Sequence, residues 1–400
     1  MRTWIVVGLL GAALALATLA GCEQKIHSTK SDSPALPSVS VAPLPAPAEA
    51  PAPVVRAAPR PAPEIPGWAP PAAADTLVLL NGQPYHLLLE AETDSNRHLT
   101  ATYEPTPGHL ERVRGYEGRY TVTLRDRAGQ QVFQRQLRKA AFFKRAGADI
   151  VTESEAYLPE FLGYSRPLGA LVFTLDFMVP DSDVGAQVVL MLDLAGNVMR
   201  LSDGRGPGGG PECEPALSAD GSVLLTASEL LRPGRPPLRL TRLDAELVGA
   251  SFLSDTTILV VYAPGKTHLI RSPDGMETFG RTPSPQQLRA PNAFVRHTRS
   301  GRVLSKFRYH GFYEELGYTI PGFRAHGVLY LLDAKRGLYL LPLGTPGKPT
   351  EMRFAAMPRF IPPQKPVEVR FEVQSEGNAF AFYVDTVSVA PRIRYQRLEN

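Results

Sequence analysis

The residues best suited to chemistry gather in the segment FRYHGFYEELGYTIPGFRAHG, at positions 307–327. It combines aromatic side chains with carboxylates and histidines, a set that suits sugar stacking and acid catalysis. The candidate ligand-binding residues are His310, Tyr313, Glu314, Glu315, Arg324 and His326. Long loops on a rigid scaffold often carry function. The alternative is a loop that only packs its aromatic side chains on the fold.

Other candidate motifs favour plain structural interpretations. DGRGPGGGP at 203–211 lacks the lysine of a phosphate-binding loop and contains prolines, which indicates a linker. Asp181 and Asp183 could contribute to a Ca²⁺ site, but full coordination needs more oxygen ligands and no EF-type loop follows, so a turn is favoured. Cys213 lacks an obvious histidine partner, which favours a passive over a reactive thiol. With no clustered histidines, neither a metal nor a cofactor is predicted.

The N-terminus reads as a secretory signal. One basic residue, Arg2, precedes an apolar run from Trp4 to Ala20, and the run ends in LAGC at residues 19–22. A plain signal or a membrane anchor is the alternative, although the run is at the short edge of what spans a bilayer. The tetrapeptide resembles the lipobox of bacterial lipoproteins. The resemblance implies cleavage before Cys22 and acylation of Cys22, as with palmitate, on its thiol and new α-amine.

Residues beyond the cysteine extend this expectation. Glu23 and Gln24 follow Cys22, and under the sorting rule of Gram-negative lipoproteins the absence of aspartate there implies the outer membrane. Residues 22–75 are rich in proline and alanine, which predicts an extended, disordered stalk. A ligand for proline-reading domains is the alternative. With Cys22 acylated, Cys213 has no partner for an intramolecular disulfide.

Charge and length place few limits on function. The net charge of +4 arises from mixed charges, and arginine-rich stretches are interrupted by alanine and phenylalanine, as on a solvated face. A membrane-tethered protein outside the cytoplasm has little access to nucleic acid, so no nucleic-acid partner is expected. The chain beyond residue 75 is long enough for one large or two ordinary domains.

Residues 76–203 predict a small β-rich domain of α+β character. Hairpins are expected over 77–90, 120–137 and 187–201, an apolar strand over 171–179, and short helices over 139–145 and 152–162. The stretches VFQRQLRKAAFF and LVFTLDFMVPDSDVGAQVVLMLDLAGNV resemble a domain of unknown function in Bacteroidota lipoproteins. That resemblance implies no activity.

Residues 204–400 carry a degenerate repeat. EPALSADGSVLLTAS, VGASFLSDTTILVVYA, HTRSGRVLSKF and VRFEVQSEGNAFAFYV each place a turn between apolar strands, near Asp220, Asp255, Ser300 and Glu376. A period of about 40 residues is typical of propeller blades. The segments are similar to blades of TolB-like and WD40-like propellers, which implies a propeller-like domain. Irregular β-sandwiches are the alternative.

RSPDGMETF at 271–279 resembles the Asp-box of sialidases and related propellers, through Ser272, Asp274, Thr278 and Phe279. In that family the box holds a hairpin together, away from the active site. Met276 replaces the usual glycine, which permits a tighter backbone conformation. The resemblance therefore supports a propeller and implies no sialidase activity.

The expected layout is a signal peptide at 1–21, a lipidated stalk at 22–75, a β-rich domain at 76–203 and a propeller-like domain at 204–400. The favoured function is binding, with a protein or glycan partner at the cell envelope, because no catalytic constellation is visible in the sequence. A carbohydrate-active envelope enzyme and a structural envelope protein are the alternatives.

Overall fold

The computed structural model describes residues 69–106, 108–204, 213–271, 277–314, 317–344, 349–385, 387 and 392–398. By its internal contacts the chain divides into residues 1–55 and 56–400, and every described residue belongs to the second part. The described residues form 27 strands and only short helices, so the expectation of a mostly β protein is confirmed. No helix in this part of the chain is long and apolar enough to cross a membrane.

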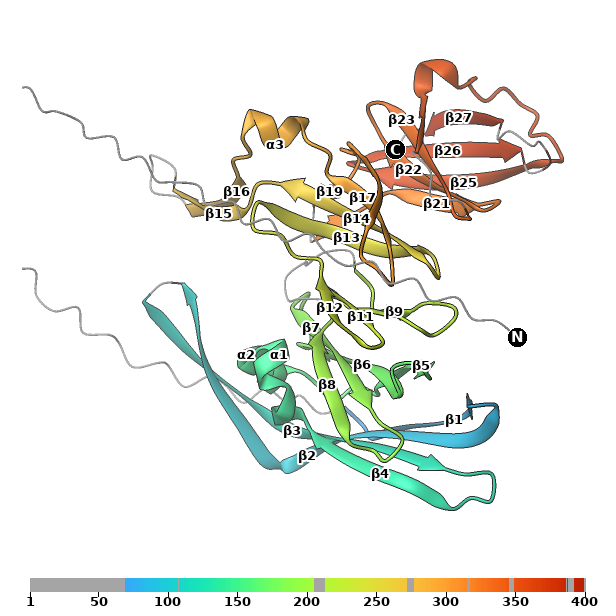
Figure 1. Ribbon diagram of the computed structural model, residues 1–400. Helices are drawn as coiled ribbons and strands as arrows, with labels where there is room; N and C mark the ends of the chain where they lie inside the picture. Colours follow the sequence, from blue (N-terminus) through green and yellow to red (C-terminus); the bar gives the residue numbers. More distant parts are fainter. Residues whose placement is uncertain are drawn as a thin grey trace, which may run out of the picture. The chain divides into compact units, whose positions relative to one another are not determined.

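The first sheet is an antiparallel meander whose strands follow one another in chain order (Figure 1). Its strands are β1 (Ala72–Leu80), β2 (Gln83–Thr106), β3 (His109–Arg125) and β4 (Gln131–Arg138). Leu80 is buried and its neighbour Leu79 is exposed, as the two faces of a strand require. Asn81 and Gly82 both have positive φ, the conformation of a two-residue hairpin turn, so the first predicted hairpin is confirmed.

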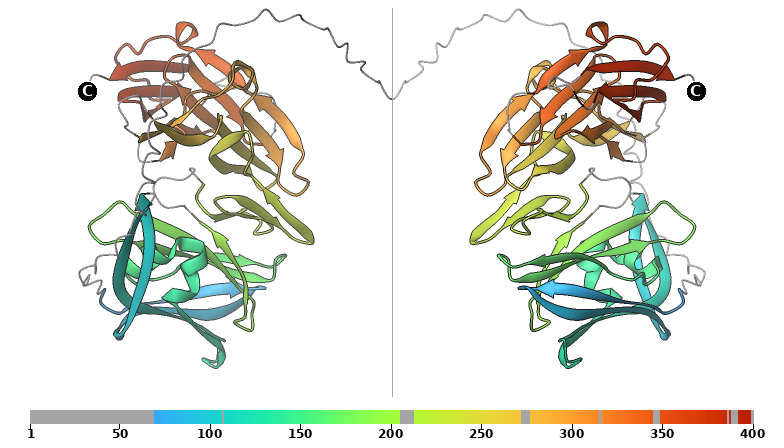
Figure 2. Two further views of the ribbon diagram at one scale, coloured as in Figure 1. Left: turned by 90° about the vertical axis from the view of Figure 1, so that its left-hand side faces the viewer. Right: turned by 90° about the vertical axis from the view of Figure 1, so that its right-hand side faces the viewer.

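Strands β2 and β3 form a long ribbon whose register shifts between Asp94 and His98. Both views in Figure 2 show this ribbon bending. Three short helical segments follow β4, and they are the 3-10 turn η1 (Lys139–Phe142), α1 (Phe143–Ala146) and α2 (Ala148–Glu153). Helix α2 contacts both strands of the ribbon. Gly115 of β3 permits this close approach, because a Cβ there would overlap the carbonyl oxygen of Thr152.

Of the two predicted helices, only the one over 139–145 is confirmed, with a 3-10 first turn. The prediction of a helix over 152–162 is wrong, because α2 ends at Glu153 and a strand begins at Glu160. Thr152 lies buried in the last turn of α2 instead of capping a new helix. Pro159 has no backbone N–H to donate and disfavours continuation.

The second sheet packs against the first. Its strands are β5 (Glu160–Ser165), β6 (Ala170–Met178), β7 (Gly185–Leu192) and β8 (Val198–Asp203), again in chain order. The apolar strand and the hairpin predicted here are confirmed. One hydrophobic cluster joins both sheets and the helices. Tyr120, Phe142 and Phe177 are fully buried in it, with ring centroids 5.3 to 6.3 Å apart.

Four more antiparallel sheets of three or four strands follow along the described part of the chain. The third sheet holds β9 (Ala216–Leu217), β10 (Leu224–Leu225), β11 (Glu229–Arg232) and β12 (Arg235–Arg239). The fourth holds β13 (Ala245–Ser254), β14 (Thr257–Pro264), β17 (Ala293–His297) and β18 (Val303–Phe307). The fifth holds β21 (Gly322–Ala325), β22 (Val328–Asp333), β23 (Gly337–Pro342) and β24 (Thr350–Arg353). The sixth holds β25 (Glu368–Ser375), β26 (Asn378–Asp385) and β27 (Ile393–Leu398).

Smaller elements lie between the strands of the fourth sheet or in the connections that follow it. They are the hairpin of β15 (Thr267–Arg271) and β16 (Glu277–Arg281), the helix α3 (Pro285–Arg289), the hairpin of β19 (Tyr313–Glu314) and β20 (Tyr318–Thr319), and the 3-10 turn η2 (Phe354–Ala356). Helix α3 begins with a capping box, in which the side chains of Ser284 and Gln287 each bond the backbone N–H of the other.

Consecutive sheets pack face to face through a series of hydrophobic clusters. One cluster joins the second and third sheets, the next joins the third and fourth, and two more join the fourth to the fifth and the fifth to the sixth. Each four-stranded sheet is a meander, as in a propeller blade, and each neighbouring pair has the character of a sandwich. Among the described residues no hydrophobic cluster joins the first sheet to the last. The domain boundary predicted at 203/204 stays a prediction.

The predicted repeat turns all lie between paired strands. They do not mark one turn per sheet, however, because Asp255 and Ser300 both belong to the fourth sheet. Residues 265–292, with β15, β16 and α3, are inserted between its second and third strands. The 45-residue spacing between these two turns therefore includes this insertion and is not a repeat period.

A buried lysine ties the first helical segment, η1, to the end of α2. Lys139 is 2% exposed, and its Nζ donates to the carbonyl oxygens of Ser154 at 2.6 Å and Thr152 at 3.4 Å. These carbonyls lie at the end of α2, where helices leave acceptors unpaired. Burial lowers the pKa of Lys139 to about 8, against the opposing charge of Glu117.

We expect Lys139 to make stability depend on pH. Between about 8 and its ordinary pKa of 10.5, the unfolded chain binds more protons at this lysine than the folded chain does. The free energy of unfolding should therefore rise from pH 8 to 9.5, by up to about 1.4 kcal/mol per pH unit. In Lys139→Met this part of the rise should vanish. Urea unfolding of both proteins across this range measures it, and equal slopes would contradict the assignment.

Candidate functional site

The candidate segment 307–327 begins inside the fold. Tyr309 is fully buried, and its hydroxyl donates to the carbonyl oxygen of Leu332 at 2.9 Å. Asn292, also buried, donates through Nδ2 to the carbonyls of Tyr262 at 2.8 Å and Tyr309 at 2.7 Å. Its Oδ1 accepts from the backbone N–H of Tyr309 at 2.8 Å. This network fixes the start of the segment to the fourth and fifth sheets.

The aromatic side chains of the segment pack against one another. The ring of Phe312 lies 6.5 Å from that of Tyr309 and 6.1 Å from that of Tyr318, between centroids. Tyr318 is 6% exposed. These three rings therefore belong to the core and not to a stacking surface for a ligand.

The histidines of the segment lie at separate places. Nε2 of His310 accepts from Nη2 of Arg308 at 3.2 Å, and burial together with the charges of Arg308 and Arg336 lowers the pKa of His310. His326 has a φ of 48° in the turn between β21 and β22. Glu315 lies outside the described residues.

Glu314 joins a cluster around an arginine. Its Oε2 accepts from Nη2 of Arg281 at 3.0 Å, and Oε2 of Glu246 lies 3.9 Å from Nη1 of the same guanidinium. Arg281 also donates to the hydroxyl of Tyr318 and lies over that ring, 5.2 Å from its centroid. Burial raises the pKa of Tyr318, so its hydroxyl stays protonated. Two carboxylates thus share one cation, which ties the β19–β20 hairpin to β13 and β16.

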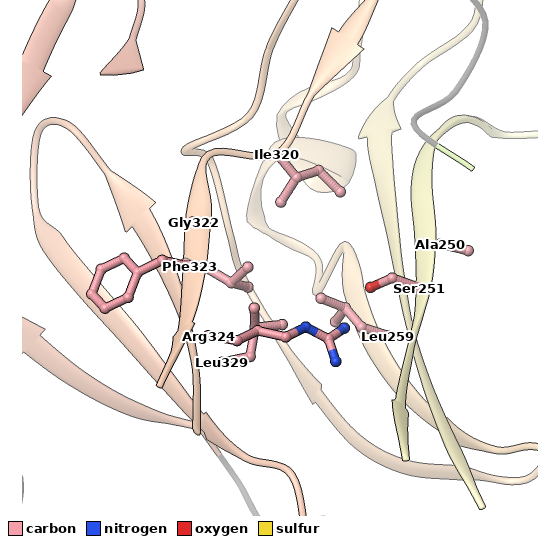
Figure 3. A pocket seen from close by; sticks show the side chains of 9 residues that line it. Ala250, Ser251, Leu259, Ile320, Gly322, Phe323, Arg324 and Leu329 are labelled. Atoms are coloured by element: carbon pink, nitrogen blue, oxygen red, sulfur yellow. The ribbon is translucent and has the colours of Figure 1, made fainter. Parts of the chain in front are cut away.

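A pocket of about 230 Å³ lies between the fourth and fifth sheets. The residues that line it are Ala250, Ser251, Leu259, Ile320, Gly322, Phe323, Arg324, Leu329 and Leu331. Figure 3 shows Arg324 reaching from β21 across the pocket toward Ser251 and Leu259. Its Nη2 donates to the carbonyl oxygen of Phe252 on β13 at 2.6 Å. The side chains that line the pocket are apolar apart from this guanidinium and the hydroxyl of Ser251.

Strand β13 is an edge strand of the fourth sheet, and its outer edge faces this pocket. The carbonyl of Phe252 points away from β14, because it accepts from Arg324. In an antiparallel strand the N–H and C=O of one residue point to the same side, and the side alternates along the strand. Ala250, two residues earlier, therefore also directs its backbone groups outward.

Strand β21 is likewise an edge strand, in the fifth sheet. The carbonyl of Pro321 accepts from the N–H of Leu332 at 2.8 Å and so points toward β22. By the same alternation, Gly322 and Arg324 direct their backbone groups outward. Both lie among the residues that line the pocket, so backbone donors and acceptors of two edge strands meet there.

Tyr313 lies elsewhere, in a smaller and more polar pocket of about 190 Å³. The β25–β26 turn, residues 374–379, forms the rest of its lining. The structure thus places Tyr313, Glu314 and Arg324 in three different surroundings, and it does not bring them into one catalytic centre.

The Asp-box resemblance falls on the β15–β16 hairpin and includes part of β16. Ser272 and Asp274 lie outside the described residues. Thr278 and Phe279 lie in β16, opposite Ile270 and Leu269 respectively. The role of the box side chains stays a prediction.

The remaining motifs have simple surroundings. Cys213 is 2% exposed and packs in the cluster between the third and fourth sheets. Asp181 and Asp183 lie in an exposed turn, where Asp181 has a φ of 57°. Within the described ranges no three His, Cys, Asp or Glu side chains are placed to hold a metal ion. Residues 205–212 of the glycine-rich stretch lie outside those ranges.

The sequence did not indicate the residues that complete the arginine cluster or the partner that Arg324 binds in the pocket. Arg281 and Glu246 are 33 and 68 residues from Glu314, and nothing in their local sequence indicates that they meet. The partner of Arg324 is a backbone carbonyl, so the identity of the side chain at Phe252 carries no signal for it.

Two of the three comparisons with known proteins find no match for this chain. No family model matches the chain, and no curated protein matches it. One of the solved structures similar to it is BamB from Moraxella catarrhalis, at 10% identity and a TM-score of 0.20, over 80% of this chain and 95% of that one. At this TM-score the two backbones do not superpose.

Proposed function

We propose that this chain is a lipid-anchored binding module of the bacterial cell envelope and that it binds its partner at the pocket between β13 and β21. The observation that carries the proposal is the guanidinium of Arg324, which reaches over an apolar pocket to a strand edge. An apolar pocket with a few convergent polar groups is the usual form of a binding site.

The anchor comes from the sequence. Acylation of Cys22 would attach the chain to a membrane, and the proline-rich stretch to residue 75 would hold the β-rich sheets away from it. Glu23 and Gln24 favour the outer membrane. In this proposal the layout remains a signal at 1–21, a stalk at 22–75, and β domains at 76–203 and 204–400.

The arginine cluster favours binding over carbohydrate-active catalysis. A glycosidase needs two carboxylates held on either side of a sugar bond, one of them protonated. Glu314 and Glu246 instead share the guanidinium of Arg281, which offsets part of their negative charge and holds them in place. This arrangement positions a hairpin beside the pocket, which suits a binding surface.

Replacing Cys22 tests the anchor. We expect Cys22→Ser to move the protein from the membrane fraction to the soluble fraction, because the acylated thiol is lost. Cys213→Ala is the matched control and should stay in the membrane fraction. Fractionation with an immunoblot measures this. Retention of Cys22→Ser with an uncleaved signal would contradict the lipoprotein assignment.

A photo-crosslinker tests the binding site. Benzoylphenylalanine at Ser251, in cells of the native host, should give a discrete crosslinked partner, whereas the same group at exposed Val132 on β4 should not. Arg324→Ala should reduce the yield by about fivefold or more, because a charge-assisted hydrogen bond is lost. Absence of an adduct at Ser251, or an equal yield in Arg324→Ala, would contradict the proposed site.

A further inference from the structure

We propose that the pocket accepts an extended peptide, which adds as a strand to the outer edge of β13 and places an acidic side chain against Arg324. This inference rests on the proposed function and names the class of partner. It combines two features of the pocket: outward backbone groups on an edge strand and a cation beside them.

The outer edge of β13 supplies the main-chain hydrogen bonds of the interaction. Ala250 and Phe252 direct N–H and C=O groups away from β14, at the spacing that the alternate residues of an added strand require. Strand addition of this kind obtains affinity from main-chain hydrogen bonds and specificity from pockets for alternate side chains. Leu259, Leu329 and Leu331 supply an apolar surface at this place.

Arg324 supplies the positive charge that would bind an acidic side chain of the peptide. Its guanidinium has five N–H donors in a planar fork, and among the described residues its hydrogen bond is to the carbonyl of Phe252. A carboxylate accepts two such donors side by side, which a backbone carbonyl does not. The arginine is exposed at the pocket, so a partner can reach it.

Strand addition and charge recognition are coupled, because the carbonyl of Phe252 and the guanidinium of Arg324 would each exchange their present hydrogen bond for one to the peptide. Without a ligand, Arg324 covers the edge of β13 by occupying the outward carbonyl of Phe252, as charged side chains do on exposed strand edges. An incoming strand would donate a backbone N–H to that carbonyl, and the freed guanidinium would bind the acidic side chain of the same strand. No buried polar group is left unpaired by the exchange.

The edge is open only over part of β13. At its start, Glu246 belongs to the arginine cluster with Tyr318, and β20 contacts β13. The pocket begins at Ala250, four residues further along the strand. The added segment is therefore short, of a few residues, and its acidic position is set by Arg324.

The test uses the full chain in detergent and two fluorescent, end-blocked heptapeptides. Both peptides alternate threonine and valine, and they differ only at the central residue, which is aspartate in one and lysine in the other. Fluorescence anisotropy should show the aspartate peptide binding about tenfold tighter or more, from one charge-assisted contact. In Arg324→Glu the preference should reverse. Arg353→Glu is the control, because Arg353 is an exposed arginine on β24, and it should leave the preference unchanged.

Backbone N-methylation separates strand addition from charge alone. Methylating the alternate amides that face β13 should abolish binding, whereas methylating the other set should not. Failure of both peptides to bind, or equal effects of the two sets, would overturn the inference. Binding of sodium decanoate in place of the peptides would overturn it too and would assign the pocket to a small apolar acid. If the crosslink at Ser251 still depends on Arg324 in that case, the proposed function stands and only strand addition fails.

Discussion

Burial of both faces of each internal sheet is the constraint on which this structure depends. Along β14, Ile258 and Val260 pack toward the third sheet, whereas Leu259 and Val261 pack toward the fifth. The same alternation occurs in β6 and β22, whose successive residues also divide between two clusters. A sheet that is apolar on both faces has no solvent side, so it is stable only between two neighbours.

This packing leaves the sheet edges as the places where polar chemistry is available. The faces are filled by aliphatic and aromatic side chains, and the edges carry unpaired backbone groups that must be covered or used. At β13 the chain covers one part of the edge with the β19–β20 hairpin, held by Arg281, and another part with the side chain of Arg324. The β19–β20 hairpin is held in place by two carboxylates. The side chain of Arg324 is held by a single hydrogen bond, which a partner can replace.

Local sequence predicted those elements whose cause is local. The turn at Asn81 and Gly82 and the apolar strand β6 follow from short-range patterns, and both are confirmed. The capping box at Ser284 and Gln287 had the same kind of signal and was overlooked. The predicted helix from Thr152 to Leu162 failed because strand β5 pairs with β6, a contact that the local sequence does not encode. The candidate site needed contacts between β13, β16 and β21, which only the packing of sheets provides.

Amide hydrogen exchange at β13 tests the central claim most directly. With the aspartate peptide bound, the backbone N–H groups of Ala250 and Phe252 should exchange more slowly, by about tenfold or more, because each gains a strand partner. The N–H of Ser251 points toward β14 and should change little. Alternating protection at Ala250 and Phe252 is the result that the account predicts. Unchanged exchange at both residues with the peptide bound would contradict it.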